Sequence, residues 1–322
     1  MLLGVAMDKV AVLGLGLIGG SLLLRSVDAA VTPSAVGYDA DPATRGLATE
    51  RLGPAAVAAD LASAVDGADL VVLAVPLPAV PTVLGALRNV GYRGLLTDVT
   101  SVKEPVRALV GEGTRFVGGH PMAGKEASGF DAADAELLVG CAWALCLDAG
   151  TALPDWLDVA RWVLAIGGQV APLTSAEHDT AVARISHLPH LVAASLTASA
   201  AAEPIGPAAL GLGAGSFRDA TRVAATRAAL TAAMCGGNAA ALTSEIDALQ
   251  ARLAEARALL TGEDPIGALT EWLEGPRAIR AQWPPPGVET ELPLTRDALL
   301  ALGRAGGRLT AIGADLARAI RP

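Results

Sequence analysis

The sequence predicts an α/β protein whose N-terminal domain is a doubly wound parallel sheet and whose C-terminal domain is all-α. Three observations carry this prediction. Short, continuously hydrophobic runs alternate with helical patterns over the first half of the 322 residues. A glycine-rich turn follows the first of these runs and opens a helical pattern. Beyond about residue 175, most segments have helical composition. We therefore expect one domain over residues 1–172 and a second over residues 173–322.

The strands of the first domain are predicted from runs that are apolar throughout rather than alternating. Such runs are typical of parallel strands, because helices cover both faces of a parallel sheet. Repeated strand–helix–strand units predict the doubly wound arrangement. Helical patterns between the runs include Ser21–Val31 and Pro78–Leu87. The predicted strands are Lys9–Leu15, Ala35–Asp39, Asp69–Val75, Gly94–Val99, Arg115–Gly119 and, later in the same domain, Cys141–Asp148.

The second half is predicted to be helical from Ser175 to roughly Leu260. Alanine, leucine, glutamate and arginine dominate it, and glycines at Gly206 and Gly211–Gly215 interrupt it. The stretch WPPPG at Trp283–Gly287 predicts a stiff polyproline-type connector. The chain that follows is too short for a separate regulatory domain of usual size.

Composition excludes several classes of function. The net charge of −9 argues against a nucleic-acid partner, because neutralising phosphates requires a basic surface. Cys141, Cys146 and Cys235 form no CxxC pair, which fits buried thiols in a reducing compartment rather than disulfides or a zinc site. No apolar stretch is long enough to span a bilayer, and no basic leader precedes Met7, which could equally be the native start. We expect a cytoplasmic protein that binds neither nucleic acid nor membrane.

The stretch GLGLIGGSL has the G-x-G-x-x-G spacing of a Rossmann-type dinucleotide loop. Gly14 would allow the tight turn, Gly16 the approach of a pyrophosphate, and Gly19 close packing of helix on strand. The free N–H groups of the helix N-terminus would bind the anion. Asp39, at the end of the second strand, would accept from ribose hydroxyls and repel a 2′-phosphate, which predicts NAD rather than NADP. The alternative is a chance glycine turn. The expected cofactor site comprises Gly14, Gly16, Leu17, Ile18, Gly19, Asp39, Val75, Pro76 and Ser101.

His120 lies in the glycine-rich stretch FVGGHPMAGKEASGF, Phe116–Phe130, at the end of a predicted strand. Ser101 follows the preceding strand. Because the carboxyl ends of parallel strands meet at one edge of the sheet, both side chains should lie near the nicotinamide. A histidine there can accept a proton from a hydroxyl as hydride leaves the attached carbon. A serine can hydrogen-bond that imidazole or the substrate. The alternative is a purely structural histidine.

Two later clusters supply candidate ligand contacts. His187 and His190 are three residues apart and would share a helix face. Two histidines without a third ligand nearby make a poor metal site, so we expect polar contacts to a ligand and no metal. Arg218 and Arg222 are four residues apart, and a planar guanidinium binds carboxylates well. The alternative for this pair is an ordinary solvated helix face with an Arg218–Asp219 ion pair.

Together these motifs resemble the prephenate/arogenate dehydrogenase family of tyrosine biosynthesis. The matching stretches occur in family order over roughly residues 9–225 and are VLGLGLIGGSL, GYD, TDVTSVK, GGHPMAGKEASG, ISHLPH and GSFRDATRVA. The resemblance implies a Rossmann domain, a helical domain that forms a homodimer, and an active site in the cleft between them. It makes His120 the catalytic histidine, Ser101 the serine beside it, and Arg222 the arginine that binds a substrate carboxylate. The further pocket residues that it implies are Glu126, His187, His190 and Arg218.

The reaction implied by the resemblance is the NAD-dependent oxidative decarboxylation of prephenate to 4-hydroxyphenylpyruvate. Hydride would leave the carbinol carbon for the nicotinamide, His120 would accept the hydroxyl proton, and the ring carboxylate would depart as carbon dioxide. Arogenate, or an aminated prephenate, is the alternative substrate. The sequence shows neither a tyrosine-binding regulatory domain nor a chorismate mutase segment, so we expect a monofunctional enzyme.

Two functions outside the family remain as alternatives. A β-hydroxyacid dehydrogenase or related imine reductase would share the glycine loop and a helical dimer domain. Those families place a catalytic lysine in the helical part, whereas this chain has no lysine after Lys125. A cofactor-binding sensor without turnover would require neither His120 nor Arg222.

Overall fold

The computed structural model describes residues 7–28, 33–125 and 127–322, and its first layer is a five-stranded parallel sheet. The strand order is β2-β1-β3-β4-β5, and helical crossovers join successive strands, as the sequence predicts. The central strand β3 is buried throughout, which explains its unbroken apolar character, and its neighbour β4 is equally buried although it ends in Thr97 and Asp98. The strands are β1 (Lys9–Leu13), β2 (Ser34–Tyr38), β3 (Leu70–Leu73), β4 (Leu95–Asp98) and β5 (Phe116–Val117).

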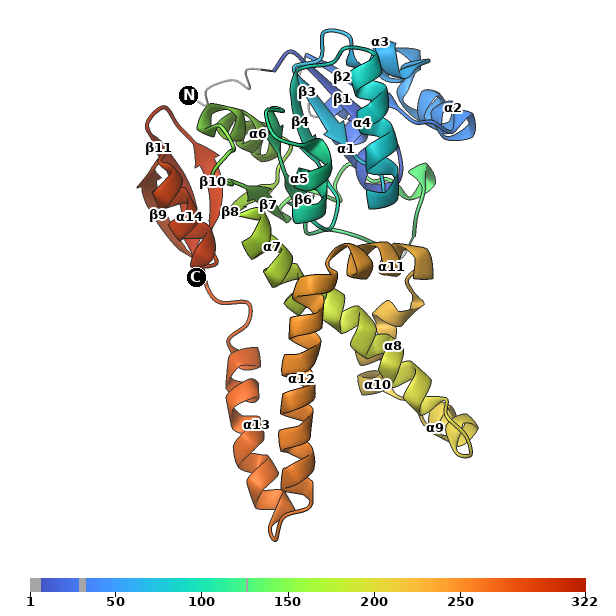
Figure 1. Ribbon diagram of the computed structural model, residues 1–322, viewed down its shortest axis with the longest axis vertical. Helices are drawn as coiled ribbons and strands as arrows, with labels where there is room; N and C mark the ends of the chain where they lie inside the picture. The colour runs from blue at the N-terminus through green and yellow to red at the C-terminus, as the bar shows by residue number, and fades with distance from the viewer. Residues whose placement is uncertain (1–6, 29–32, 126) are drawn as a thin grey trace.

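Helices lie on both faces of this sheet (Figure 1). They bury two separate clusters of apolar side chains against it. The helix α1 packs on one face, whereas α3, α4 and α5 pack on the other. Local signals set the boundaries: Asp41 caps α2 by accepting from the N–H groups of Ala43 and Thr44. The helices are α1 (Leu17–Asp28), α2 (Pro42–Leu52), α3 (Leu61–Val65), α4 (Val80–Asn89) and α5 (Glu104–Val110), with 3-10 turns η1 (Pro54–Ala56) and η2 (Leu77–Ala79).

A second, six-stranded sheet begins where the structure departs from the predicted strand Arg115–Gly119. That stretch divides into β5, which joins the parallel sheet, and β6, which pairs with β7 in antiparallel fashion. The chain changes sheet at a glycine that packs tightly, since a Cβ on Gly119 would lie 2.7 Å from the carbonyl oxygen of Asp98. His120 therefore lies within β6. The neighbouring elements are β6 (Gly119–Pro121), η3 (Phe130–Ala132), β7 (Ala142–Cys146), α6 (Leu153–Ala165) and β8 (Gln169–Leu173).

The last residues of the chain, which the sequence analysis grouped with the helical half, form three strands of this second sheet and one helix. We call residues 288–321 the C-terminal module. Its strand β10 pairs antiparallel with β8, giving the sheet order β6-β7-β8-β10-β11-β9. Its apolar residues Leu292, Leu299 and Leu309 join the same core as Trp143 and Trp156. The elements are β9 (Val288–Pro293), α14 (Arg296–Arg304), β10 (Arg308–Ile312) and β11 (Leu316–Arg321).

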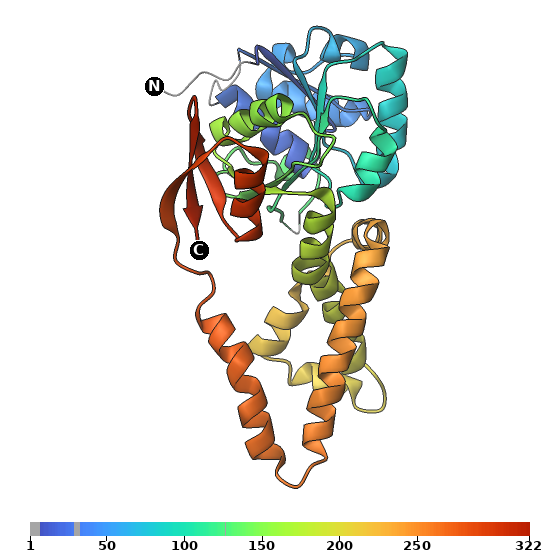
Figure 2. The same cartoon turned by 60° about the vertical axis from the view of Figure 1, so that its left-hand side comes forward.

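Between β8 and the C-terminal module the chain is helical, as predicted. Figures 1 and 2 both show α7 leaving the sheets and a long hairpin of α12 and α13 extending away from them. The elements are α7 (Ser175–Val182), the π-helical turn η4 (Ala183–His187), α8 (Leu188–Ala200), α9 (Gly206–Gly211), α10 (Gly215–Thr221), the 3-10 turn η5 (Arg222–Ala225), α11 (Ala228–Gly237), α12 (Ala239–Leu260) and α13 (Pro265–Ala281).

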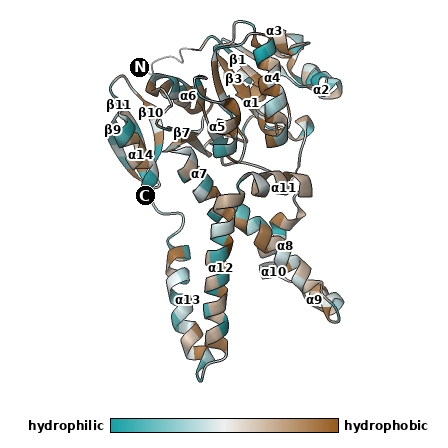
Figure 3. Cartoon of the chain, viewed as in Figure 1, coloured by the Kyte–Doolittle hydropathy of each residue, from teal (hydrophilic) through white to brown (hydrophobic). Residues whose placement is uncertain are grey.

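The outer helices bury few of their apolar side chains within the chain. On α12 only Leu242 is buried, and α13 buries none of the residues that the structure describes. Large exposed side chains follow these two helices, among them Leu253, Ile266 and Ile279. Figure 3 shows apolar positions along α13 and α8 as well as in the sheets. Within the described part of the chain, no helix combines the length and apolarity needed to cross a membrane.

Candidate active site

His120 is the first member of a hydrogen-bonded series that crosses from β6 to α7. Its Nδ1 lies 2.9 Å from Nε2 of His178, although the two residues are 58 positions apart in the sequence. Nδ1 of His178 lies in turn 2.7 Å from Oδ1 of Asp179. His178 and Asp179 are buried in the first turns of α7, whereas His120 is half-buried. We call His120, His178 and Asp179 the relay.

The carboxylate fixes the position of every proton in the relay. An ionised Asp179 can only accept, so Nδ1 of His178 carries a hydrogen. Nε2 of a neutral His178 then accepts, and Nδ1 of His120 must be the donor. Nε2 of a neutral His120 is consequently left unprotonated. The arrangement therefore produces an imidazole that can accept a proton at Nε2, and it stabilises the resulting cation through His178 and Asp179.

The surroundings of the relay favour the protonation states that this assignment requires. Desolvation of the ring, the neighbouring His178 and the Lys103 ammonium hold the pKa of His120 well below its usual value. Burial also lowers the pKa of His178, against the opposing effect of its hydrogen bond to Asp179. Although burial raises the pKa of Asp179, hydrogen bonds from His178 and two backbone N–H groups outweigh it and leave that pKa lowered. At neutral pH the relay is thus two neutral imidazoles and one carboxylate.

A buried ion pair, Asp98–Lys103, holds the backbone that carries His120. Both side chains are completely buried. The ammonium of Lys103 pairs with Oδ2 of Asp98 and donates to the carbonyl of Gly119 at 2.6 Å. Oδ1 of Asp98 accepts the N–H of Gly119 at 3.0 Å. Both peptide groups of the residue before His120 are therefore fixed by one ion pair at the end of β4.

We expect Lys103→Met to lower the free energy of unfolding by about 3–5 kcal/mol, because it leaves the Asp98 carboxylate buried without its cation. The matched control is Lys125→Met, which breaks an ion pair with Asp134 whose side chains are 43% and 46% exposed. We expect about 0–1 kcal/mol for that change. Urea unfolding at one fixed protein concentration measures both values. Equal effects of the two substitutions would contradict the role given to Lys103.

Asp179 and Asn238 connect α7 to its neighbours and bring His187 to the relay. Oδ1 and Oδ2 of Asp179 accept the backbone N–H groups of Lys103 and Glu104, at 2.8 and 2.9 Å, at the start of α5. Nδ2 of Asn238 donates to the carbonyl of Asp179 at 2.7 Å and to Nδ1 of His187 at 3.1 Å. The start of α7 is therefore tied to both α5 and α12.

His187 is a buried donor whose partner is absent from the described part of the chain. Because Asn238 donates to its Nδ1, the neutral ring carries its hydrogen on Nε2. That nitrogen is buried and makes no hydrogen bond to any described residue. Burial lowers the pKa of His187 to about 4, so the ring is neutral at pH 7. A buried N–H without an acceptor is costly, which suits a site that a ligand oxygen completes.

The glycine loop has the geometry that a dinucleotide requires. Gly14 has φ of 98°, and a Cβ there would lie 2.5 Å from the carbonyl oxygen of Ala74. A Cβ on Gly19 would lie 1.9 Å from the carbonyl oxygen of Gly14, so this glycine permits α1 to approach the loop. A Cβ on Gly16 would meet nothing within 4 Å. Packing at positions 14 and 19 therefore requires glycine. Gly16 instead faces open space, beside Leu17 and Ile18 at the start of α1.

Asp39 lies beside this loop, as expected for a ribose-binding carboxylate. Its Oδ2 accepts the N–H of Leu15 at 2.7 Å, and its Oδ1 accepts the N–H of Asp41 at 2.9 Å. Each oxygen retains a lone pair for a sugar hydroxyl. The Arg45 guanidinium lies over the Tyr38 ring and donates to the backbone carbonyl of Asp39 at 2.7 Å. The residues present therefore fit an adenosine ribose.

The helical half reaches the same edge of the parallel sheet. Val75 and Pro76 follow β3, and Pro76 precedes η2. The end of α11 packs there, since a Cβ on Gly237 would lie 2.6 Å from Leu77 and 3.3 Å from Val102. Ser101 is half-buried in the loop between β4 and α5, next to this contact. The cofactor loops, the relay and α11 therefore surround one region at the carboxyl ends of the strands.

Three of the remaining predicted residues lie on the helices that follow α7. His190 is on α8, where its Nδ1 hydrogen-bonds the carbonyl of Ser186 at 2.9 Å. Arg218 on α10 and Arg222 in η5 are exposed, and both elements pack against α8. The relay consists of His120, His178 and Asp179 and includes neither arginine. Glu126 lies outside the described residues.

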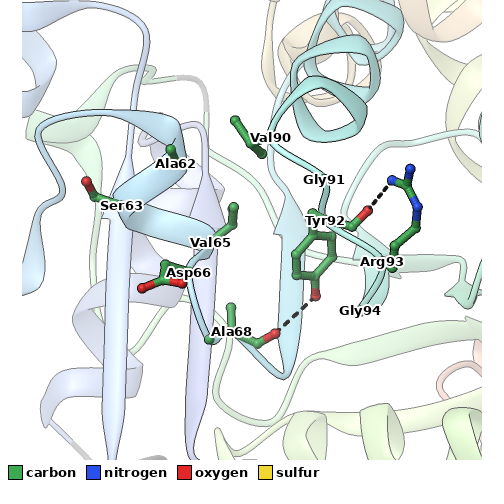
Figure 4. Close-up of a pocket in the computed structure, with 11 residues that line it drawn as sticks. Ala62, Ser63, Val65, Asp66, Ala68, Val90, Gly91, Tyr92, Arg93 and Gly94 are labelled. Carbon is green, nitrogen blue, oxygen red and sulfur yellow. Dashed lines mark hydrogen bonds between the residues drawn. The ribbon is translucent and has the colours of Figure 1, made fainter.

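An open depression of about 560 Å³ lies at the opposite edge of the parallel sheet. It is formed by the segments that precede β3 and β4, including Asp66, Tyr92 and Arg93 (Figure 4). Its tyrosine hydroxyl donates to the backbone carbonyls of Leu95 and Ala68. No histidine lines it. The chemistry of the candidate site therefore belongs at the carboxyl edge, where ligands bind in open α/β sheets.

Comparison with known families agrees with this geometry. The nucleotide-binding domain of prephenate dehydrogenase matches residues 27–171, and the dimerization domain of prephenate dehydrogenase matches residues 174–274. The chain belongs to the prephenate dehydrogenase family. It is therefore an oxidoreductase with a nucleotide-binding domain and a helical domain, and the C-terminal module lies outside both matched segments.

Individual relatives extend the match over most of the chain. Cyclohexadienyl dehydrogenase of Zymomonas mobilis is 33% identical over 84% of this chain and 94% of its own length. Prephenate dehydrogenases of Lactococcus lactis and Bacillus subtilis are 30% and 32% identical over 68% and 69% of this chain, which spans only 61% and 62% of their lengths.

Two solved structures have the same fold. Prephenate dehydrogenase of Aquifex aeolicus, in complex with hydroxyphenyl propionate and NAD+, superposes with a TM-score of 0.78 at 25% identity, covering 86% of this chain and 98% of the other. Synechocystis arogenate dehydrogenase superposes with a TM-score of 0.72 at 31% identity, covering 85% and 99%.

Sequence reasoning missed most of the residues that surround His120. Asp98, Lys103, His178, Asp179 and Asn238 were not singled out. One signal was available: His178 is one of only four histidines, and an aspartate follows it directly. A second was Lys103, one of only three lysines in the sequence. Nothing in the spacing indicated that His178 and His120 would touch.

Proposed function

We propose that the protein catalyses the NAD-dependent oxidative decarboxylation of prephenate to 4-hydroxyphenylpyruvate. The observation that carries the proposal is the relay, which leaves Nε2 of His120 unprotonated beside the cofactor edge of the sheet. Oxidising a carbinol requires a group that accepts the hydroxyl proton while hydride departs. The orphan donor on His187 and the half-buried hydroxyl of Ser101 lie around the same region and would hold the substrate.

NAD bound along Gly14, Gly16 and Gly19 would supply the hydride acceptor. The N–H groups at the start of α1 would bind its pyrophosphate, and Asp39 would accept from its ribose hydroxyls. We propose NAD rather than NADP because the Asp39 carboxylate would repel a 2′-phosphate. Val75, Pro76 and Ser101 would line the nicotinamide side of the site.

His120 would act as the general base of the reaction. As the substrate hydroxyl loses its proton to Nε2, Nδ1–H of the new imidazolium continues to donate to His178. The Asp179 carboxylate, two hydrogen bonds away, stabilises that positive charge without itself becoming protonated. Loss of the ring carboxylate as carbon dioxide then leaves its electron pair in the ring, which becomes an aromatic phenolate. The phenolate oxygen would take back the proton from Nε2 of His120, and the gain of aromaticity renders the reaction irreversible.

We propose, from the resemblance, that Arg222 binds a substrate carboxylate, with Arg218, His190 and Glu126 as further pocket residues. Arg222→Gln is expected to raise KM for the substrate about tenfold or more, because a charge-assisted pair contributes about 1.5–3 kcal/mol. The turnover number should change by only a few-fold. Steady-state kinetics measure both values. An unchanged KM would remove Arg222 from the substrate site.

The proposed function is tested by the absorbance of the reduced cofactor at 340 nm. Purified protein is mixed with NAD and prephenate, then with arogenate in place of prephenate, and finally with NADP in place of NAD. Our proposal predicts the highest kcat/KM with prephenate and NAD. A preference for arogenate would reassign the enzyme as an arogenate dehydrogenase. Absence of turnover with both substrates would reject the proposal and favour the cofactor-binding sensor.

We also propose that the protein is a homodimer, with the division between its domains at residues 172 and 173, in the last residues of β8. The exposed apolar side chains of α12 and α13, such as Leu253, Ile266 and Ile279, support this, because an isolated chain would leave them in water. The matched dimerization domain supports it as well. Light scattering of the purified protein would measure the mass directly.

A further inference from the structure

The first turn of α7, which carries His178 and Asp179, is held from outside by the C-terminal module. Arg304, at the end of α14, donates from Nε to Oε1 of Glu177 at 2.6 Å. The other oxygen of Glu177 accepts the N–H and the hydroxyl of Thr174 at 2.8 and 2.9 Å, which completes the capping box of α7. Glu177 immediately precedes His178. The ion pair therefore ends one residue from the relay.

A second arginine of the module, Arg296, holds the loop between β7 and α6, which hydrogen-bonds the first residue of α7. Its guanidinium donates to the backbone carbonyls of Leu147, Asp148 and Thr151 at 3.1, 2.6 and 2.5 Å. The carboxylate of Asp148 accepts the N–H and the hydroxyl of Ser175 at 2.8 and 2.6 Å. Ser175 is buried and is the first residue of α7. Two arginines of α14 thus fix the same helix turn, one directly and one through a loop.

The contact between α14 and the strand that leads into α7 leaves no space for adjustment. A Cβ on Gly303 would lie 1.6 Å from the carbonyl oxygen of Pro172 in β8. Only glycine permits this approach of helix to strand. Because β8 continues into α7 within a few residues, the position of α14 sets the direction in which α7 leaves the sheet.

The relay depends on that direction. His178 reaches His120 on β6 across a single hydrogen bond of 2.9 Å, and such bonds weaken steeply when their geometry is disturbed. The Arg304 and Glu177 side chains are 55% and 33% exposed, and solvated ion pairs of this kind contribute little to folding stability. The Arg304–Glu177 ion pair should therefore affect the position of His178 more than the free energy of unfolding.

We propose that the C-terminal module positions the relay, with Arg304 acting through Glu177 as a positioning residue for the reaction proposed above, on which this inference rests. Neither side chain is assigned a contact with substrate or cofactor. The module lies outside both segments that match the family, so this support is supplied by a part of the chain that the family match does not cover.

The experiment compares Arg304→Ala, Glu177→Gln and Arg304→Lys with the control Arg318→Ala, all in the full-length protein. Arg318 is an exposed arginine on β11 of the same module. Since a misplacement of 1 Å can cost about 10²-fold in rate and the ion pair is solvated, we expect Arg304→Ala and Glu177→Gln to lower kcat about 3- to 10-fold. KM for prephenate and KM for NAD should both stay within about twofold of the wild-type values. Arg304→Lys should retain most of the wild-type kcat, because lysine can still pair with Glu177. Arg318→Ala should match the wild type.

A readout that does not depend on turnover accompanies the kinetics. The ¹⁵N resonances of His120 and His178 should shift in Arg304→Ala and stay unchanged in Arg318→Ala. Wild-type kcat in both Arg304→Ala and Glu177→Gln would overturn the proposal, as would a fall in kcat that follows only the thermal midpoint while the histidine resonances stay unchanged. If the wild type oxidises neither prephenate nor arogenate, the proposed function fails, and the histidine resonances alone decide the positioning role.

Discussion

His120→Asn is expected to lower kcat by about 10²–10⁴-fold, the range typical of a lost general base. Asparagine can still donate from Nδ2 to Nε2 of His178, so the buried end of the relay keeps its partner. It cannot accept a proton from the substrate hydroxyl. KM for prephenate and for NAD should change by only a few-fold, because binding depends on other groups. Steady-state kinetics measure these values.

The thermal midpoint and the affinity for NAD serve as controls for this variant. Both should remain close to the wild-type values, since His120 is half-buried and its main hydrogen bond is retained. A variant that keeps more than a tenth of the wild-type kcat would exclude His120 as the base.

Asp179→Asn is expected to lower kcat about 10²-fold, because it removes the negative charge that stabilises the cationic form of the relay. Oδ1 of Asp179 accepts from both Nδ1 of His178 and the N–H of Lys103, so an amide oxygen at that position keeps both hydrogen bonds. The hydrogens of the relay therefore stay in place. The imidazolium that forms at His120 loses the carboxylate that offsets its charge.

This substitution has a second effect that must be measured with the first. Asp179 also accepts the N–H groups of Lys103 and Glu104, and an amide can satisfy only one of them. We therefore expect the free energy of unfolding to fall by about 1–3 kcal/mol. Asp155→Asn, which alters an ion pair with Arg115 at the surface, is the control. A variant that is less stable but has wild-type kcat would show that Asp179 only supports the fold.

The sequence predicted those parts of the fold that are determined by residues close together in the chain. The glycine loop, the parallel strands and the helical half each follow from residues that are close in sequence. The relay does not, because His120 and His178 come from β6 and α7. The pair His178–Asp179 reads in the sequence as an ordinary polar helix turn. The pair contacts His120 and the start of α5 only because the fold packs α7 against β6 and α5.

The C-terminal module was misjudged for a related reason. The sequence analysis weighed its length, which is too short for an independent domain, and grouped it with the helical half. The alternation of polar and apolar residues in Val288–Pro293 and Leu316–Arg321 is typical of half-buried antiparallel strands. That pattern could have predicted strands. It could not have predicted their partner, because β8 lies more than a hundred residues earlier in the chain.

Histidine NMR gives the most direct test of the claim that the relay prepares Nε2 of His120 to accept a proton. A protein labelled with ¹⁵N at its four histidines, assigned through single substitutions, is titrated downward from pH 8. Because burial of the ring holds the pKa of His120 well below that of a free imidazole, its ring should stay neutral at pH 7 and take up a proton only at a markedly lower pH than an exposed histidine. At pH 7 we predict a protonated Nδ1 and an unprotonated Nε2. A proton on Nε2 at pH 7, or a ring already cationic there, would contradict the account.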